Sequence, residues 1–262
     1  MTHFLKHHPG APPGFFAWEA AGLRWLSTVD GGVPCAQVVS VDDTSLALRR
    51  LDSVTASPEA ARAFGGQLAV THDAGAAAFG AGPEGWDGPG FFGPGKPPSQ
   101  PLPMSLRRHR RWGGFYADER LAPMAELAAA RLDASTRATV DFVAARCRAG
   151  DFDDDDRPAR LHGDLWSGNV MWTPDGVVLI DPAAHAGHRE TDLAMLALFG
   201  CPHYDAVLAG YQRVRPLTPG WRDRIGLHQL FPLLAHVVLF GGGYARQTDA
   251  AARAALAARP AV

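Results

Sequence analysis

The stretch Leu161–Asn169 reads L-H-G-D-L-W-S-G-N, and the apolar segment that follows it ends in Ile180-Asp181-Pro182. Asp164 supplies a carboxylate that can accept a proton from an attacking hydroxyl. Asn169 follows in the same loop, and Asp181 stands at the end of an expected strand, so both can turn an oxygen ligand toward one ion. Such ligands hold Mg²⁺ against nucleotide phosphates. The pattern predicts phosphoryl transfer, with Asp164 as the catalytic residue and Asn169 and Asp181 as metal ligands.

Length, charge and cysteine content narrow the class of protein. The chain has 262 residues, 47% of them hydrophobic and 20% charged, enough for one large domain or two lobes. Its net charge of −2 favours neither nucleic acid nor an anionic membrane as a partner. The longest apolar run, Leu230–Phe240, is shorter than the roughly 20 residues that span a bilayer, and the N-terminus has no apolar signal core. We therefore expect a cytoplasmic protein, with its three scattered cysteines reduced.

Hydrophobic periodicity and turn residues predict mixed secondary structure. The expected elements are strands at 2–6, 37–41, 44–48, 170–172 and 177–180, and helices at 15–28, 58–74, 122–132, 134–149 and through the chain after residue 188. Ser57 is the expected N-cap of the second helix, with Pro58 at its first position. Glycine and proline fill residues 79–103, which we expect to form a long loop. The acidic run 151–156 is expected to be a solvated connection.

The catalytic stretch resembles that of the aminoglycoside phosphotransferases, and more closely that of the fructosamine (ketosamine-3) kinase family. The hallmark L-H-G-D-L-W-S-G-N of that family is unbroken at Leu161–Asn169. A second hallmark resembles I-D-P-A-x-Y-x-G-H-R-E-x-D-L-A-M and occupies Ile180–Met195, with His185 where tyrosine is usual. Weaker similarities extend over most of the chain. The resemblance implies a protein-kinase-like fold with ATP and Mg²⁺ as cofactors.

The resemblance also implies roles for residues around the catalytic loop. Asp192 would brace the backbone of that loop, and His162 would support it. Trp166 would stack on the substrate through its aromatic face, with a core position beneath the loop as the alternative. His185 would bind the substrate as well.

The nucleotide side follows from the same resemblance. Lys6 on the first strand would contact the phosphates, steadied by Glu19 on the first helix. The backbone of Arg50 and Leu51, after the third strand, would receive adenine.

The resemblance sets the expected architecture as well. In the family a Gly-rich hairpin precedes the lysine strand, whereas only five residues precede Lys6 in this sequence. We therefore expect an α+β, bilobal protein-kinase-like fold. Residues 1–52 would form a truncated N-terminal lobe that lacks the Gly-rich hairpin, and residues 53–262 a mostly helical C-terminal lobe.

The implied reaction is ATP-dependent phosphorylation of the 3-hydroxyl of ketosamines, the fructosamine or ribulosamine adducts, in deglycation repair. The partner would be a small sugar–amine adduct, with glycated protein lysines as a further candidate. One alternative is an aminoglycoside or amino-alcohol phosphotransferase, against which Trp166 and Ser167 argue. The other is a non-catalytic nucleotide-binding protein. The absent hairpin favours it, and the intact Asp164, Asn169 and Asp181 oppose it.

Overall fold

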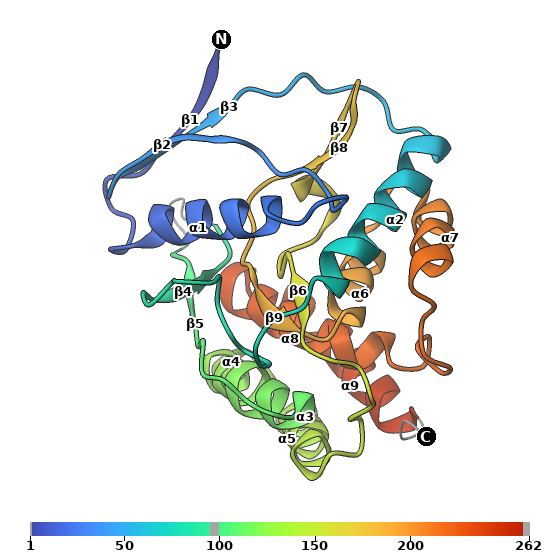
Figure 1. Ribbon diagram of the computed structural model, residues 1–262. Helices are drawn as coiled ribbons and strands as arrows, with labels where there is room; N and C mark the ends of the chain where they lie inside the picture. The colour runs from blue at the N-terminus through green and yellow to red at the C-terminus, as the bar shows by residue number, and fades with distance from the viewer. Residues whose placement is uncertain (1, 95–99, 259–262) are drawn as a thin grey trace.

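A small antiparallel sheet and one helix form the first part of the fold, in a computed structural model that describes residues 2–94 and 100–258. Strands β1 (His3–His7), β2 (Val38–Val41) and β3 (Ser45–Arg49) lie in the order β1-β3-β2. Helix α1 (Phe15–Ser27) packs its buried face on β3, as Figure 1 shows in blue. The four predicted elements are confirmed, each within one residue at either end.

Two long helices lie side by side at one edge of the molecule (Figure 1): α2 (Pro58–Asp73) and α7 (Tyr204–Val214). Ser57 caps α2 as predicted, since its Oγ accepts the amide hydrogen of Ala60 at 3.2 Å. Glycines allow the helices to touch, because a Cβ at Gly65 would come within 1.9 Å of the Val207 carbonyl oxygen. A Cβ at Gly210 would come equally close, at 1.9 Å, to the carbonyl oxygen of Arg62.

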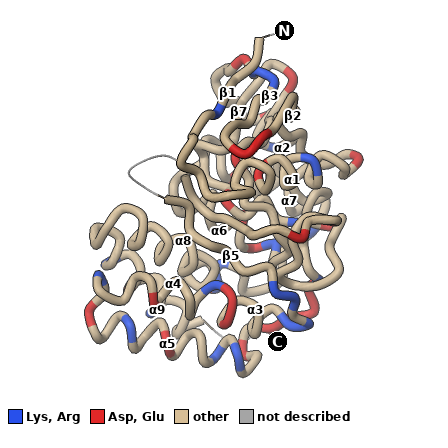
Figure 2. Tube along the Cα trace, turned by 90° about the vertical axis from the view of Figure 1, so that its left-hand side faces the viewer, with Lys and Arg blue, Asp and Glu red and all other residues tan. Residues whose placement is uncertain are grey.

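The remaining helices enclose the largest group of buried apolar side chains. They are α3 (Trp112–Tyr116), the π-helical turn η1 (Ala117–Leu121), α4 (Ala122–Ala128), the 3₁₀ turn η2 (Ala129–Arg131), α5 (Ala134–Ala149), α6 (Glu190–Phe199), α8 (Ile225–Phe240), the 3₁₀ turn η4 (Gly242–Tyr244) and α9 (Ala245–Ala257). The helix predicted to start at residue 122 belongs to a helical run that already begins at Trp112. Gly113 and Gly114 argue against a helix in the sequence, because glycine has a low helix propensity. In the structure, burial of the neighbouring aromatic rings stabilises the helix there. Figure 2 shows acidic and basic segments interleaved along α5.

Residues 79–103, predicted to be a loop, contain two short strands. β4 (Gly90–Phe92) pairs with β5 (Leu102–Met104), so the expectation of a structureless segment was wrong. Both phenylalanines of β4 are buried, and the indole Nε1 of Trp18 on α1 donates to the Phe91 carbonyl at 3.0 Å. Contacts with a distant helix therefore order a segment whose glycine and proline content alone favours a loop.

Two strand pairs position the catalytic stretch. β7 (Val170–Thr173) and β8 (Gly176–Leu179) form the predicted hairpin, and η3 (Ser167–Asn169) leads into it. β6 (Ala159–Leu161) pairs with β9 (His185–Gly187), which was not predicted because each strand has only three residues and its partner is distant in sequence. No described helix is long and apolar enough to cross a membrane.

Candidate active site

A cavity of about 700 Å³ opens between the small sheet, the catalytic loop and α8. Its walls include six of the predicted site residues together with the hinge: Lys6, Glu19, Asp164, Trp166, Asn169, Asp181, Arg50 and Leu51. His162, His185 and Asp192 are buried behind this wall. The fold thus brings Lys6, near the start of the chain, into the same cavity as Asp164 and Asp181.

Asp192 holds the backbone of the catalytic loop in place through hydrogen bonds, and its side chain is fully buried. Its carboxylate accepts the amide hydrogens of His162 at 2.8 Å and Gly163 at 3.0 Å, and it lies 3.1 Å from Nε2 of His72. Gly163 has a φ of 80°, and a Cβ there would come within 2.2 Å of the Ala183 carbonyl oxygen. Only glycine fits this turn, which delivers Asp164 to the cavity.

Asn169 ties the two acidic residues together. Its Nδ2 donates to the carbonyl oxygen of Asp164 at 2.8 Å and to the carboxylate of Asp164 at 3.3 Å. The same nitrogen lies 3.4 Å from the carbonyl oxygen of Asp181. Because the amide nitrogen makes these contacts, the side-chain oxygen Oδ1 remains for a cation. Burial, followed by the nearby Asp181 charge, raises the pKa of Asp164 to about 7.

His162 links the catalytic loop to the strand end that precedes Asp181. Its Nε2 donates to the Ile180 carbonyl at 2.8 Å, while its Nδ1 accepts the amide hydrogen of Asp164 at 3.2 Å. These two bonds require a neutral ring with its hydrogen on Nε2. Burial agrees with this state, since it lowers the pKa of His162.

Lys6 bridges the first helix and the turn after β8. Its ammonium lies 2.6 Å from Glu19 Oε1 and 2.5 Å from Asp181 Oδ1. Burial opposes the charge on Lys6, but the two carboxylates outweigh it and raise the pKa of the ammonium. Burial also raises the pKa of Glu19 to about 7, against the opposing effect of Lys6. Asp181 itself has a φ of 55°, an unfavourable backbone conformation for a non-glycine residue.

Arg50 and Leu51 of the predicted hinge both line the cavity. The amide hydrogen of Arg50 donates to the Thr2 carbonyl at 3.2 Å, so it is not free for adenine. At Arg50 the carbonyl oxygen is therefore the backbone group that remains for the proposed contact with adenine, and Leu51 also lines the cavity. Leu48, Met171 and Ile180 supply apolar walls nearby, which suit a flat nucleotide base.

The two predicted substrate residues lie in different environments. The Trp166 side chain is 41% exposed on the cavity wall, which excludes the alternative of a core position. It lies over Gly168, where a Cβ would come within 2.2 Å of the indole ring atom Cη2. His185 is only 4% exposed and its Nδ1 lies 2.8 Å from the Ala183 carbonyl oxygen. The prediction that His185 contacts substrate is corrected, because β6–β9 pairing places it beneath Gly163.

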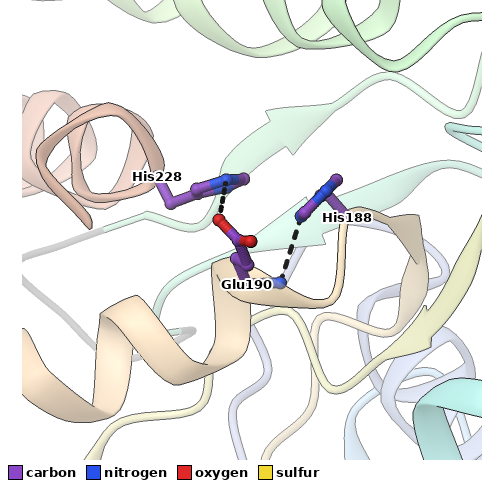
Figure 3. A group of neighbouring side chains, drawn as sticks. All are labelled: His188, Glu190 and His228. Atoms are coloured by element: carbon purple, nitrogen blue, oxygen red, sulfur yellow. Dashed lines mark hydrogen bonds and ion pairs between the residues drawn. The ribbon is translucent and has the colours of Figure 1, made fainter. Parts of the chain in front are cut away.

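A second group of ionisable side chains lies outside the cavity. His188, Glu190 and His228 are buried together, with the Glu190 carboxylate between the two rings in Figure 3. Arg224 donates to both oxygens of Glu190, at 3.0 and 2.5 Å, so a guanidinium already neutralises that carboxylate. We therefore interpret the group as a structural ion network at the start of α6 rather than a metal centre.

Asp154 and Asp156 of the acidic run 151–156 join this network, so the prediction of a solvated connection was wrong for these two residues, while Asp155 is exposed. The side chains of Asp154 and Asp156 are each 8% exposed. Asp154 lies 3.2 Å from His188 Nε2, and Asp156 accepts a hydrogen bond from Arg189 at 2.5 Å. Composition alone suggests that such a run is solvated. Here, basic side chains neutralise these two carboxylates, which allows their burial.

Family comparison agrees with this geometry. Residues 1–258 match the family model described as fructosamine kinase. The chain belongs to the fructosamine kinase family. A candidate ketoamine kinase from Lactiplantibacillus plantarum is 34% identical over 255 residues, covering 94% of this chain and 84% of the relative. Family membership makes the chain a phosphotransferase that acts on a hydroxyl group.

Solved structures support the family and the fold. A candidate fructosamine-3-kinase from Thermobifida fusca is 47% identical with a TM-score of 0.88, covering 98% of this chain and 86% of that one. A choline/ethanolamine kinase family protein from Mesorhizobium loti has a TM-score of 0.60 at 15% identity, covering 97% of this chain and 82% of that one, and shows the fold alone. The predicted α+β, protein-kinase-like class is confirmed, and this fold implies ATP as the phosphate donor.

Sequence reasoning missed part of the cavity wall. Phe91, Phe92, His236 and Phe240 line it, from β4 and the end of α8. The only signal for the last two was a weak family similarity near the C-terminal end of the chain. No sequence signal pointed to Phe91 and Phe92 of β4, because they lie in the segment expected to be a loop.

Proposed function

We propose that this fructosamine kinase family member transfers the γ-phosphate of ATP to the 3-hydroxyl of a ketosamine. Phosphorylation at that position makes the adduct labile, so the amine is released and the reaction serves deglycation repair. The names of the relatives, ketoamine kinase and fructosamine-3-kinase, support this choice of substrate. A small sugar–amine adduct is the proposed substrate, with glycated lysines on proteins as a second form of it.

The observation that carries the proposal is the shared cavity of Asp164 and the Lys6–Asp181 ion pair. Asp164 accepts the hydroxyl proton, and its pKa of about 7 suits a group that must both take and release a proton. Lys6, oriented by Glu19, contacts the phosphates. A proposed N-terminal lobe, residues 1–52, contributes this lysine, and the rest of the chain contributes the acceptor side.

The residues present fit a magnesium ion. Asp181 offers a carboxylate that is 41% exposed, and Asn169 offers the amide oxygen left free by its own hydrogen bonds. Hard oxygen ligands of this kind, few in number, are what Mg²⁺ takes from proteins when phosphates supply the rest. When bound, the ion would neutralise charge on the phosphates. We propose that Asn169 and Asp181 hold it.

The test is ADP release with Mg-ATP on fructosyl-lysine, ribulosyl-lysine, a glycated peptide, kanamycin and choline. We expect turnover on the ketosamines and a loss of about 10²–10⁴-fold in Asp164→Asn, the usual contribution of a general base. NMR of the product locates the phosphate. Turnover confined to kanamycin or choline would contradict the proposed substrate, and nucleotide binding without any turnover would contradict catalysis.

A further inference from the structure

A row of aromatic rings runs beside the cavity, and three members of the row, Trp166, His236 and Phe240, line it. Trp166 lies edge-on to Phe199, with ring centroids 6.4 Å apart, and Phe199 lies 4.7 Å from His236. Beyond His236 the row continues to Phe240 and Tyr244, at 5.1 and 5.0 Å. Trp166 and Phe240 are 41% and 54% exposed. Large aromatic side chains left open beside a catalytic carboxylate indicate that a ligand covers them.

His236 is the only member of this row with a ring nitrogen acceptor, and its protonation is set by a local bond. Nδ1 lies 2.7 Å from the carbonyl oxygen of Pro232, one turn earlier on α8. A carbonyl oxygen only accepts, so Nδ1 carries the hydrogen and Nε2 of the neutral ring carries a lone pair. Within the part of the chain that the structure describes, Nε2 makes no hydrogen bond. Burial lowers the pKa of His236, which keeps the ring neutral near pH 7.

A ketosamine differs from a free ketose by a secondary amine, which is protonated at neutral pH and donates hydrogen bonds. Building on the proposed function, we propose that His236 Nε2 accepts a hydrogen from this ammonium while the aromatic row packs against its alkyl or aryl substituent. Hydrogen bonds that involve a charged partner are the stronger kind, and aromatic faces attract cations. His236 is then the residue that selects an amine adduct over a plain sugar, and the preferred adducts carry an alkyl or aryl amine.

A pair of matched substrates tests this assignment. One is 1-benzylamino-1-deoxyfructose, and the other is the ether 1-O-benzylfructose, which lacks the N–H donor. We expect the wild type to prefer the amine by at least about tenfold in kcat/KM, the value of one charge-assisted hydrogen bond. In His236→Phe, which keeps a ring, kcat/KM for the amine should fall by about 10–100-fold, mainly through KM, while the ether changes by less than about threefold. Phe142→Tyr, at an exposed position of α5 that does not line the cavity, is the control and should keep the preference.

Two results would overturn the inference. One is an equal loss on amine and ether in His236→Phe with its thermal midpoint unchanged. If that variant unfolds, His236→Gln decides, because its amide oxygen can replace the acceptor: the assignment requires that it keep the amine preference, and loss of the preference overturns it. Failure of the proposed function itself is distinct, since the wild type would then phosphorylate neither fructose derivative while accepting kanamycin or choline.

Discussion

Asp164 and Asp181 line one cavity, but the chain holds them in different ways. Below Asp164, the loop backbone is fixed by the buried carboxylate of Asp192, which accepts two of its amide hydrogens. The Asp181 side chain is 41% exposed and, within the described chain, bonds only Lys6, and the residue has a φ of 55°. The side proposed for the acceptor is therefore preorganised, whereas the Asp181 carboxylate on the proposed nucleotide side is held by a single ion pair, which a bound cation would rearrange.

The largest expected effect comes from removing the Asp192 carboxylate, which holds the catalytic loop. Asp192→Ala leaves two buried amide hydrogens and His72 without their acceptor. We expect a loss of about 3–5 kcal/mol in the free energy of unfolding, typical of a buried pair broken on one side. Urea denaturation measures it. Asp141→Ala on the exposed face of α5 is the control and should stay within about 0.5 kcal/mol. A loss as small as that of the control would show that the loop does not depend on Asp192.

Removing the ion pair should act on activity more than on stability. Among the described residues, Lys6 is the one cation that contacts Asp181, and Lys6→Met removes it and leaves Glu19 buried without it. We expect kcat/KM for ATP to fall by about 10²–10³-fold, the range for one removed electrostatic donor. Steady-state kinetics with varied ATP measure this. The exposed Arg24→Met on α1 is the control. An unchanged kcat/KM for ATP in Lys6→Met would contradict the view that the Lys6–Asp181 ion pair organises the proposed nucleotide side.

The pKa of Asp164 predicts opposite pH trends in activity and stability. Because the base must be ionised, kcat/KM for the acceptor should rise as the pH increases toward about 7 and then level off. The folded carboxyl binds its proton more tightly than the unfolded one, so its contribution to stability is complete below 3.8 and is lost as the pH rises to about 7. Denaturation of wild type and Asp164→Asn over this range isolates the contribution. A pH-independent difference between them would contradict the raised pKa.

The smallest effect is expected at the edge of the acceptor side. Gly168→Ala would place a methyl group within 2.2 Å of the Trp166 ring and push it from its position. Loss of one packed ring should raise KM for the ketosamine by about 3–10-fold, within the usual value of an aromatic contact. KM for ATP should not change. Gly66→Ala on α2 is the control, because a Cβ there would meet its nearest neighbours, on α7, at the ordinary contact distances of 3.6 and 3.8 Å. Equal changes in both KM values would show that Gly168 supports the loop rather than Trp166.

The sequence could predict the elements that local patterns encode. The strand and helix around Lys6 and Glu19, the Ser57 cap and the β7–β8 hairpin follow from periodicity and turn residues. The catalytic loop could be found because its residues are adjacent in sequence. Short pairings such as β6–β9 could not, because three residues carry too little pattern and the partner strand is distant.

By itself, the sequence determined the reaction class, since Asp164, Asn169 and Asp181 form a recognisable pattern of chemical groups. The tertiary structure decided what surrounds each group. It brought Lys6 to Asp181 across 175 positions, buried His185, paired Asp154 and Asp156 with basic side chains, and left Trp166 exposed. Burial and distance depend on segments that pack from elsewhere in the chain, so a residue's own neighbours in sequence do not specify them. For the same reason His236 could be assigned a role only after α8 had placed it on the cavity wall.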